Sequence, residues 1–492
     1  MNDTLIEAIS FDSTAVPTRS LWNIITSCLA TLIACTWVAI HPNIPAANEG
    51  SIRVLSRRLA IVFFMLLTPE LVIYWATRQF FGAYEIARRH KSKGWTMTHG
   101  FFLIMGGFAL YDNGTFVRIL EEEELETLEK EGKVKWPKIT ADDINDKSKG
   151  DFFSKGVVIM QSTWFIIQCI MRVCRQLTLT KLEVGTLAYA PLTMLIYALW
   201  WRKPLGVGRP VPVYLKRTPH TLHKRNTTPL YTPPLPTIPE SEPWVPGDSF
   251  QLPRTTDQYR PMFANHGGFY NTQSSALNYS IPFLKCIFIY LKEQFGDILS
   301  LPIQKLSRCW KSRRERHGLI VSVVSMFIYQ PLAKFLGFFD EMVNLTYFKG
   351  ANRVPTFYSP KIEEYSSVIA SYIMVLVGTV FGVIHCTAWT FEYPTIMEMW
   401  SWRICSLVIF NVPVVVLISG RASMKVDNLA TLSFASFFEF TSKSLIFCLF
   451  LLSVVVYISA RVILVVLIFI SLRELPTSAF VDIDWVSYFP HV

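Results

Sequence analysis

Acid–base side chains lie inside stretches of this sequence that are otherwise apolar enough to cross a membrane. The groups that could carry catalysis are Glu70, His99 and His385. A buried carboxyl group keeps its proton and suits general acid catalysis, while an imidazole titrates near neutrality and can relay protons. Each group is costly in lipid, so we expect it to face other helices or a polar cavity. Each is also compatible with a simple helix–helix hydrogen bond.

A stripe of polar side chains runs along the apolar segment 152–174. Gln161, Gln168 and Arg172 are separated by seven and four residues, spacings that fall on one face of a helix. Because lipid cannot hydrogen-bond these groups, the stripe predicts a face turned towards other helices or water. The remaining members of the predicted substrate-binding set are Trp164, Trp389 and Glu392.

Sequence patterns for metals and cofactors give no support for either. The nine cysteines form no CxxC pair, and no HExxH, P-loop or GxGxxG pattern occurs, so we predict no metal site and no cofactor. Residues 142–146 spell DDxxD, a pattern that can hold magnesium against a prenyl diphosphate. Lys147 and Lys149 partly neutralise it and no second acidic motif follows, so we interpret it as a solvated loop or helix start.

The composition and the apolar runs predict an all-α, polytopic membrane protein. Of 492 residues, 51% are hydrophobic and only 17% charged, and the mean hydropathy is +0.32. The apolar runs have the length that a bilayer demands. We expect about eight transmembrane helices and one short re-entrant or interfacial helix at 95–111. The predicted spans are 21–40, 59–81 around Pro69 and Glu70, 152–174, 182–201, 319–339, 365–390, 403–419, bent at Pro413, and 444–472, interrupted by Arg461.

These spans divide the chain into two membrane groups joined by a linker. Gly378 and Gly382 have the spacing that lets two helices approach closely. The segment after Gly206 is rich in Pro, Thr and Ser and cannot bury a core. The predicted parts are an N-terminal tail (1–20), a first helix group (21–205) with a charged loop (112–151), a Pro-rich cytosolic linker (206–318) with an amphipathic helix near 281–301, a second helix group (319–472) and a C-terminal tail (473–492).

Basic loops indicate an orientation in the membrane. If 95–111 re-enters, the basic clusters at 88–93, 202–225, 313–316 and 403 lie on one side with the N-terminus, which predicts that both termini are cytosolic. The Asn344-Leu345-Thr346 sequon would then be luminal and a candidate glycosylation acceptor. We expect the endoplasmic reticulum or the plasma membrane. The net charge of +10 indicates contact with membrane lipids and no nucleic acid.

Several motifs together resemble a large family of fungal multi-pass membrane proteins, most of which have no assigned function. The motifs are HPNIP (41–45), WTMTHGFFLIMGGF (95–108), DKSKGD (146–151), LEVGTLAYAP (182–191), WWRKPLGV (200–207), GVIHCTAW (382–389) and WVSYFPHV (485–492). The chain is also similar, in its multi-pass organisation alone, to membrane-bound terpene cyclases of fungal meroterpenoid pathways. That resemblance implies Glu70 as proton donor, assisted by His99 or His385, with Trp164 and Trp389 facing a carbocation.

Three functions are compatible with these features. The first is a membrane enzyme that acts by acid catalysis on a hydrophobic small molecule, an isoprenoid or lipid. The second is a channel or transporter that uses the same polar cavity. The third is a receptor or scaffold whose Pro-rich linker recruits partners.

Overall fold

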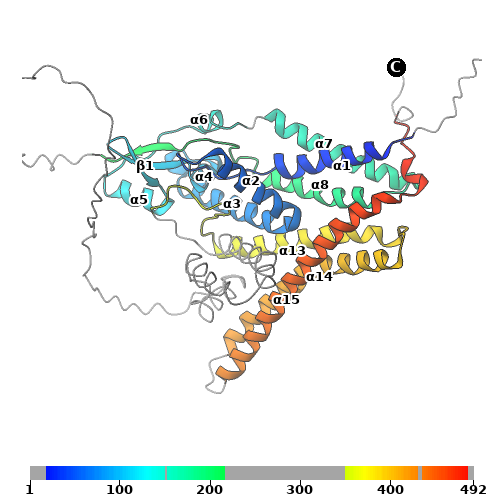
Figure 1. Cartoon of the computed structure of the whole chain (residues 1–492). Coiled ribbons are helices and arrows are strands. Elements are labelled where there is room, and N and C mark those ends of the chain that lie inside the picture. The colour runs from blue at the N-terminus through cyan, green and yellow to red at the C-terminus, as the bar shows by residue number, and fades with distance from the viewer. Residues whose placement is uncertain (1–17, 150–151, 217–349, 430–434, 486–492) are drawn as a thin grey trace, which may run out of the picture. The chain divides into compact units, whose positions relative to one another are not determined.

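The computed structural model describes residues 18–149, 152–216, 350–429 and 435–485, and these are mostly helical (Figure 1). The described helices that are long and apolar enough to cross a membrane on their own number six. They are α1 (Leu21–Ile33, continued as a wider helix to Val38), α7 (Phe152–Cys174), α8 (Lys181–Leu199), α13 (Glu364–Cys386), α14 (Ile396–Leu429) and α15 (Ala435–Ile470). The protein is therefore a multi-pass helical membrane protein, as predicted.

A broken helix pair replaces the single span predicted at 59–81. Helix α2 (Ser51–Leu67) and helix α3 (Pro69–Arg89) meet at Thr68 with a bend of 115°. The chain on either side of the pair comes together, since the Ile44 amide donates to the Met105 carbonyl at 2.9 Å. Helices α2 and α3 therefore form a hairpin whose two outer ends lie at the same end of the bundle.

A small extramembrane unit follows the hairpin. It contains α4 (Met97–Ile104), α5 (Glu122–Lys130), α6 (Ala141–Asp146) and a sheet of strand order β2-β1-β3. Strands β1 (Phe108–Asp112) and β2 (Thr115–Ile119) are antiparallel, and β3 (Val211–Tyr214) pairs parallel with β1. The turn between β1 and β2 is Asn113-Gly114, both with positive φ, which matches the twist of a two-residue hairpin.

This unit corrects two boundaries predicted from the sequence. The apolar stretch 95–111 is not one re-entrant helix, because α4 ends at Ile104 and the chain continues through Gly106 into β1. The start of the predicted linker is also ordered, because β3 adds an edge to the sheet and Lys216 donates its amide to the Lys133 carbonyl at 2.7 Å. The remaining linker, the helix near 281–301, the basic cluster 313–316, the span 319–339 and Asn344 lie outside the described residues.

Contacts between distant loops define two ends of the bundle. The sheet end contains the segments 39–50, 88–149, 200–216 and 350–363. Its contacts include a hydrogen bond from Lys203 to the His41 carbonyl and an ion pair between Arg88 and Glu363. The termini end contains 18–20, 175–180, 387–395 and 471–485. There Arg19 pairs with Glu183 at 2.5 Å, and Thr18 forms a β-bridge with Val481.

This division corrects the predicted topology. The basic clusters at 88–93 and at 202–203 lie at the sheet end, whereas the N-terminal segment 18–20 and Arg403 lie towards the termini end. The difference arises because α2 and α3 return instead of crossing, so the chain after them is on the opposite side from the one expected.

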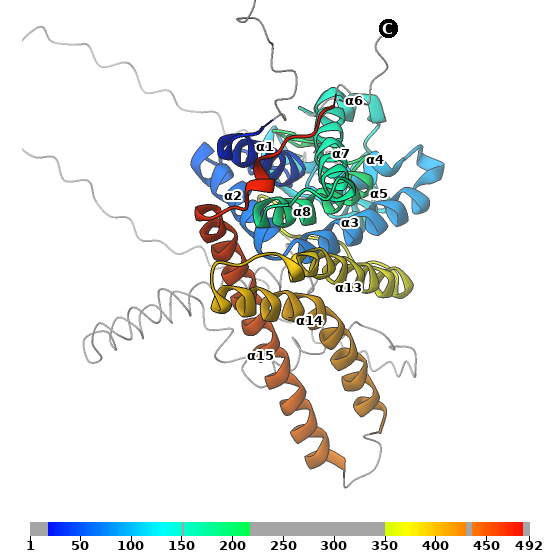
Figure 2. The ribbon, with the colours of Figure 1, turned by 90° about the vertical axis from the view of Figure 1, so that its right-hand side faces the viewer.

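Helices α13, α14 and α15 pack in sequence, and glycine makes the first contact close (Figure 2). A Cβ atom added to Gly378 would lie 2.8 Å from Cγ of Pro413, and one added to Gly382 would lie 2.5 Å from Cα of Phe410. The predicted close approach at these two glycines is confirmed, and the partner helix is α14.

Candidate functional site

The bend between α2 and α3 leaves backbone carbonyls without helical partners inside the bundle. Pro69 has no N–H to donate, and Thr68 adopts φ −143° and ψ 65°. Side chains from two other helices take up the freed carbonyls. The Tyr189 hydroxyl of α8 donates to Leu66 O at 2.5 Å, and Nε of Arg461 in α15 donates to Leu67 O at 2.8 Å. A broken backbone is thus satisfied by protein, as it must be at membrane depth.

An ion pair lies directly beside this bend. Nη2 of Arg461 is 3.7 Å from Oε2 of Glu70, the second residue of α3, and both side chains are buried. The guanidinium also covers the Phe381 ring at 3.8 Å and approaches the Tyr457 ring at 5.7 Å. We call Glu70, Tyr189, Tyr457 and Arg461, with the Leu66 and Leu67 carbonyls, the break site.

The break site contains polar atoms that no hydrogen bond reaches among the described residues. They are Oε2 of Glu70, the Tyr457 hydroxyl and Nη2 of Arg461. The Tyr457 hydroxyl faces the Glu70 carboxyl group, and Nη2 of Arg461 faces Oε2 of Glu70 as its ion-pair partner. Buried polar atoms are nearly always satisfied, so these three make the break site a candidate site for a bound ion or ligand. Their chemistry is that of carboxylate and hydroxyl oxygens beside a fixed cation.

Two proline-containing helices meet at this point. Pro69 begins α3, and Pro413 of α14 packs on Gly378, whose added Cβ would also lie 3.7 Å from Cγ of Glu70. The site is near mid-span, since Tyr189 and Arg461 each stand close to the middle of their membrane segments.

His385 belongs to the same neighbourhood but does not touch Glu70 directly. Its ring stacks on Phe381 at 4.7 Å, and Phe381 carries the Arg461 guanidinium on its own face. Nδ1 of His385 is 2.9 Å from the Phe381 carbonyl, which makes Nδ1 the protonated nitrogen, and Trp402 Nε1 donates to the His385 carbonyl at 3.1 Å.

His99 lies in a different part of the molecule. It closes the first turn of α4, where Nδ1 accepts from the Thr96 amide at 3.2 Å and Nε2 donates to the Ile139 carbonyl at 2.9 Å. Helix α4 packs on α3 where Gly100 meets Ala83, thirteen residues or about 20 Å beyond Glu70 along the helix. The structure therefore does not bring His99 to Glu70, and its hydrogen bonds indicate a capping role.

The predicted stripe on α7 connects helices and tail segments. Gln161 donates to Thr31 of α1 at 3.1 Å, and Gln168 is half-buried. Arg172 donates to the Thr178 carbonyl and, at 2.8 Å, to the Val481 carbonyl. Gln161 and Arg172 thus contact other parts of the protein, as predicted for the stripe, and Arg172 ties the C-terminal segment to the termini end.

The three other predicted residues also lie towards the termini end. Trp164 packs on Trp485 at 4.7 Å between ring centroids. The Trp389 carbonyl accepts from Arg403 at 2.9 Å, and the Glu392 carbonyl accepts from Lys181 at 2.8 Å. None of these contacts joins them to the break site.

The sequence analysis did not identify Lys203, a buried lysine at the sheet end. Nζ of Lys203 donates to the His41 carbonyl at 2.5 Å and to Oε1 of Gln79 at 2.9 Å, and it lies 4.9 and 4.6 Å from the ring centroids of Trp75 and Trp200. Burial lowers the pKa of Lys203 well below its usual range, while the carbonyls and indole faces favour the charged form. Lys203 links the end of α8 to α3 and to the HPNIP loop. The WWRKP motif, which contains this lysine, is the sequence feature that could have identified it.

A histidine and two carboxylates at the sheet end could in principle hold a metal ion. His90, Glu122 and Glu126 offer ligand atoms within 4.8 Å of one another. However, Arg89 already donates to both oxygens of Glu122, at 2.9 and 2.8 Å. Burial would raise the pKa of Glu122, but hydrogen bonds from His90 and Arg89 outweigh it and the pKa is lowered. An ion-pair network that fastens α5 to α3 accounts for this cluster.

The DDxxD segment is a helix start, as interpreted from the sequence. Thr140 and Asp143 form a capping box for α6, in which Oδ2 of Asp143 accepts from the Thr140 amide at 2.9 Å. Asp142 and Asp146 are exposed.

The chain belongs to DUF8562, a family of unknown function whose profile matches residues 8–219 and 363–492. Residues 1–7 and 220–362 lie outside the match, and the second of these ranges contains most of the predicted Pro-rich linker. No curated protein and no solved structure matches the chain. The membership and the six apolar helices agree with a family of membrane proteins without an assigned activity.

Proposed function

We propose that this member of a family of unknown function is a membrane transport protein, with the break site as its ion- or proton-binding site. The observation that carries the proposal is the hairpin whose bend lies beside the buried Glu70–Arg461 pair. Transporters place their binding sites near the bilayer midplane, where helices are discontinuous. Ionisable groups at that depth are expensive and mark ion or proton pathways.

The chemistry of the pair supports an exchange mechanism. Glu70 and Tyr457 offer oxygen ligands, and Arg461 is a resident counter-ion held by one hydrogen bond to Leu67 O and by the Phe381 face. A proton or metal cation that binds Glu70 replaces Arg461 as its partner. Because the guanidinium keeps its other contacts, the exchange needs no loss of helix packing.

Acid catalysis by Glu70 is a second hypothesis for the function of this carboxyl group. A terpene-cyclase-like mechanism needs Glu70 to face a hydrophobic substrate, whereas its observed neighbours are Arg461 and the α13 glycine Gly378. The neighbouring guanidinium favours transport over proton donation to an olefin. Recruitment of partners by the linker concerns residues outside the described part of the chain.

Reconstitution of the full chain into liposomes tests the transport proposal. Proton, sodium and potassium fluxes are measured in turn with trapped indicator dyes. Removal of one partner of a buried pair leaves an unpaired charge and costs about 3–5 kcal/mol of stability, so single variants fail for structural reasons. The decisive variant is Glu70→Gln with Arg461→Gln, which removes both charges and keeps hydrogen-bonding groups.

We expect the double variant to unfold near the wild-type temperature and to lose flux to the level of empty liposomes. The matched control is Arg88→Gln with Glu363→Gln, which removes an exposed ion pair at the sheet end and should keep full flux. Full flux in the Glu70 and Arg461 double variant, or no flux of any of the three ions through the wild type, contradicts the proposal.

A further inference from the structure

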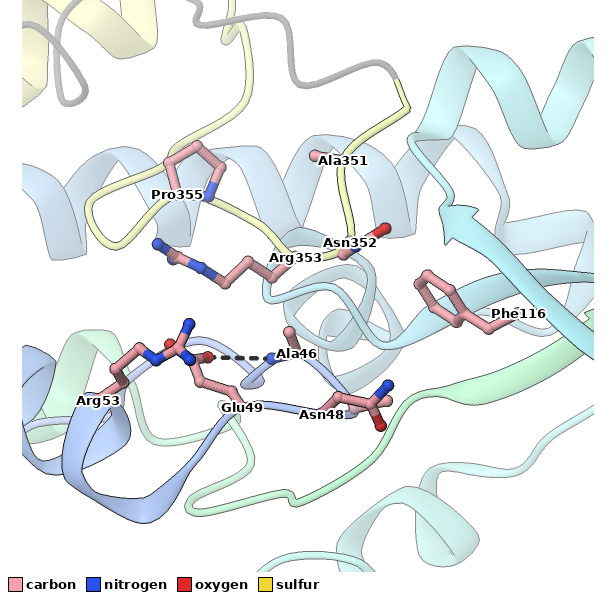
Figure 3. A pocket seen from close by; sticks show the side chains of 10 residues that line it. Ala46, Asn48, Glu49, Arg53, Phe116, Ala351, Asn352, Arg353 and Pro355 are labelled. Atoms are coloured by element: carbon pink, nitrogen blue, oxygen red, sulfur yellow. Dashed lines mark hydrogen bonds between the residues drawn. The ribbon is translucent and has the colours of Figure 1, made fainter. Parts of the chain in front are cut away.

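A cavity of about 660 Å³ opens at the sheet end, away from the break site. Its walls are the loop before α2, strand β2 and the segment before α13 (Figure 3). The polar and aromatic lining residues are Asn48, Glu49, Arg53, Phe116, Asn352 and Arg353. This volume lies in the range of small-molecule sites.

The cavity carries surplus positive charge. Arg53 and Arg353 reach into the same space from opposite walls (Figure 3). The carboxylate in the lining, Glu49, is already engaged by Arg57 at 2.5 Å and by the Ala46 amide at 3.2 Å. Within the described ranges, neither Arg53 nor Arg353 forms an ion pair, and Arg353 repels Arg57. An anion in the cavity would relieve this repulsion.

The backbone adds to the attraction for an anion. Helix α2 begins at Ser51, beside the lining loop, and no side chain caps its N-terminus. The positive end of the helix dipole therefore acts in the same direction as the two guanidinium groups. The amide side chains of Asn48 and Asn352 stand exposed at the rim as further donors. Guanidinium forks and backbone amides together are typical of phosphate recognition.

Exposed apolar side chains of α2 lie beside the cavity. The first turns of α2 expose Ile52, Leu55 and Leu59, with Ile52 84% exposed. Between them and the bundle, Arg58 donates to the Trp37 carbonyl at 2.9 Å and stacks on the Trp37 ring, an arrangement typical of the membrane interface. A headgroup could therefore enter the cavity while its acyl chains remain in the membrane.

We propose that this cavity binds a phosphate-bearing anion, with Arg53 and Arg353 as its charged contacts. The phosphate belongs either to a phospholipid headgroup or to a soluble phosphate compound. The inference is independent of the transport proposal, because no residue of the break site lines the cavity.

Binding to the purified full chain in detergent tests the assignment, with native mass spectrometry and thermal stabilisation as readouts. The probes are dioctanoyl phosphatidic acid, dioctanoyl phosphatidylcholine, inositol hexakisphosphate and inorganic phosphate. The test variant is Arg53→Gln with Arg353→Gln. Arg202→Gln with Arg209→Gln removes two exposed arginines of the same end and serves as the control.

We expect at least one phosphate probe to bind the wild type and the control equally, and to bind the test variant roughly tenfold or more weakly. Binding of phosphatidic acid alone assigns a lipid headgroup, and binding of the soluble probes assigns a soluble ligand. Equal loss in both double variants, which indicates a general basic surface, overturns the proposal. Absence of binding to the wild type by every probe overturns it as well.

Discussion

The Glu70–Arg461 ion pair could be predicted from the sequence only in part. Glu70 stood out because a carboxyl group in an apolar run needs compensation. Arg461 was visible only as an interruption of the last apolar run, almost four hundred residues away. Opposite charges inside two membrane segments are expected to form an ion pair, because each would otherwise be uncompensated in lipid. The contacts with Leu67 O and Phe381, however, depend on the path of the hairpin, which local periodicity does not contain.

His41 gives a residue-scale prediction about pH. It is fully buried; burial and the nearby Lys203 lower its pKa from 6.5 to about 3. The unfolded chain binds a proton as the pH falls below 6.5, whereas the folded protein does not until about pH 3. Stability is therefore complete above pH 6.5 and is lost through this window, by roughly 2 kcal/mol between pH 7 and pH 5.

Thermal unfolding in detergent at pH 7 and pH 5 measures this loss. Glu122, whose pKa is lowered from 4.5, contributes only at lower pH and does not interfere. We expect His41→Gln to flatten the change between the two pH values. An unchanged pH dependence in the variant would assign the acid sensitivity to another group.

At the scale of elements, the sequence was sufficient to predict the long apolar helices. It did not locate the break between α2 and α3 or the small sheet. The spans near α1, α7, α8 and α13 were found because length and hydropathy report directly on a bilayer crossing. The hairpin was read as a continuous span, since Pro69 is compatible with a kink or a full break. The contacts of Tyr189 and Arg461 with the freed carbonyls stabilise the break.

The small sheet shows a different limit. Asn113-Gly114 between two alternating runs was a hairpin signal in the sequence. The sequence analysis did not use this signal, because Phe108 to Tyr111 continues an apolar run that began in α4. Strand β3 was hidden for another reason, because its four residues stand at the start of a Pro-rich stretch and pair with a strand a hundred residues earlier.

Gly382 tests the packing of α13 on α14. A Cβ added there would lie 2.5 Å from Cα and 2.6 Å from N of Phe410, and backbone cannot yield as a side chain can. We expect Gly382→Ala to destabilise the protein by about 1–3 kcal/mol, the usual cost of overpacking. The control is Gly156→Ala in α7, where nothing lies within 4 Å. That change should be neutral or stabilising by about 1 kcal/mol. Equal thermal midpoints for the two variants would contradict close packing at Gly382.

For the whole molecule, the two ends differ in their basic residues. At the sheet end, Arg88 and Arg89 end helix α3, and Lys91 and Lys93 follow it. The extramembrane unit adds its own basic residues, and Arg202 and Lys203 follow α8. The termini end holds fewer, namely Arg19, Arg172, Arg175, Lys181, Arg403 and Arg473. Lys and Arg are retained on the cytosolic side. We therefore expect the sheet end in the cytosol and both termini on the opposite side of the membrane. The sequence analysis, which treated 59–81 as an uninterrupted span, had predicted a cytosolic N-terminus.

Glycosylation mapping in a eukaryotic host decides this orientation. An Asn-Ser-Thr acceptor on a flexible tag after Val492 should be glycosylated, because residues 486–492 are too few to recross the bilayer from the termini end. The native Asn113-Gly114-Thr115 sequon, in the hairpin turn at the sheet end, should carry no glycan, so Asn113→Gln leaves the mass unchanged. A glycan at Asn113 with a bare tag would place the sheet end in the lumen. The Arg53 and Arg353 cavity would then face the leaflet poorer in anionic lipid, and a soluble phosphate compound would become the better candidate for its ligand.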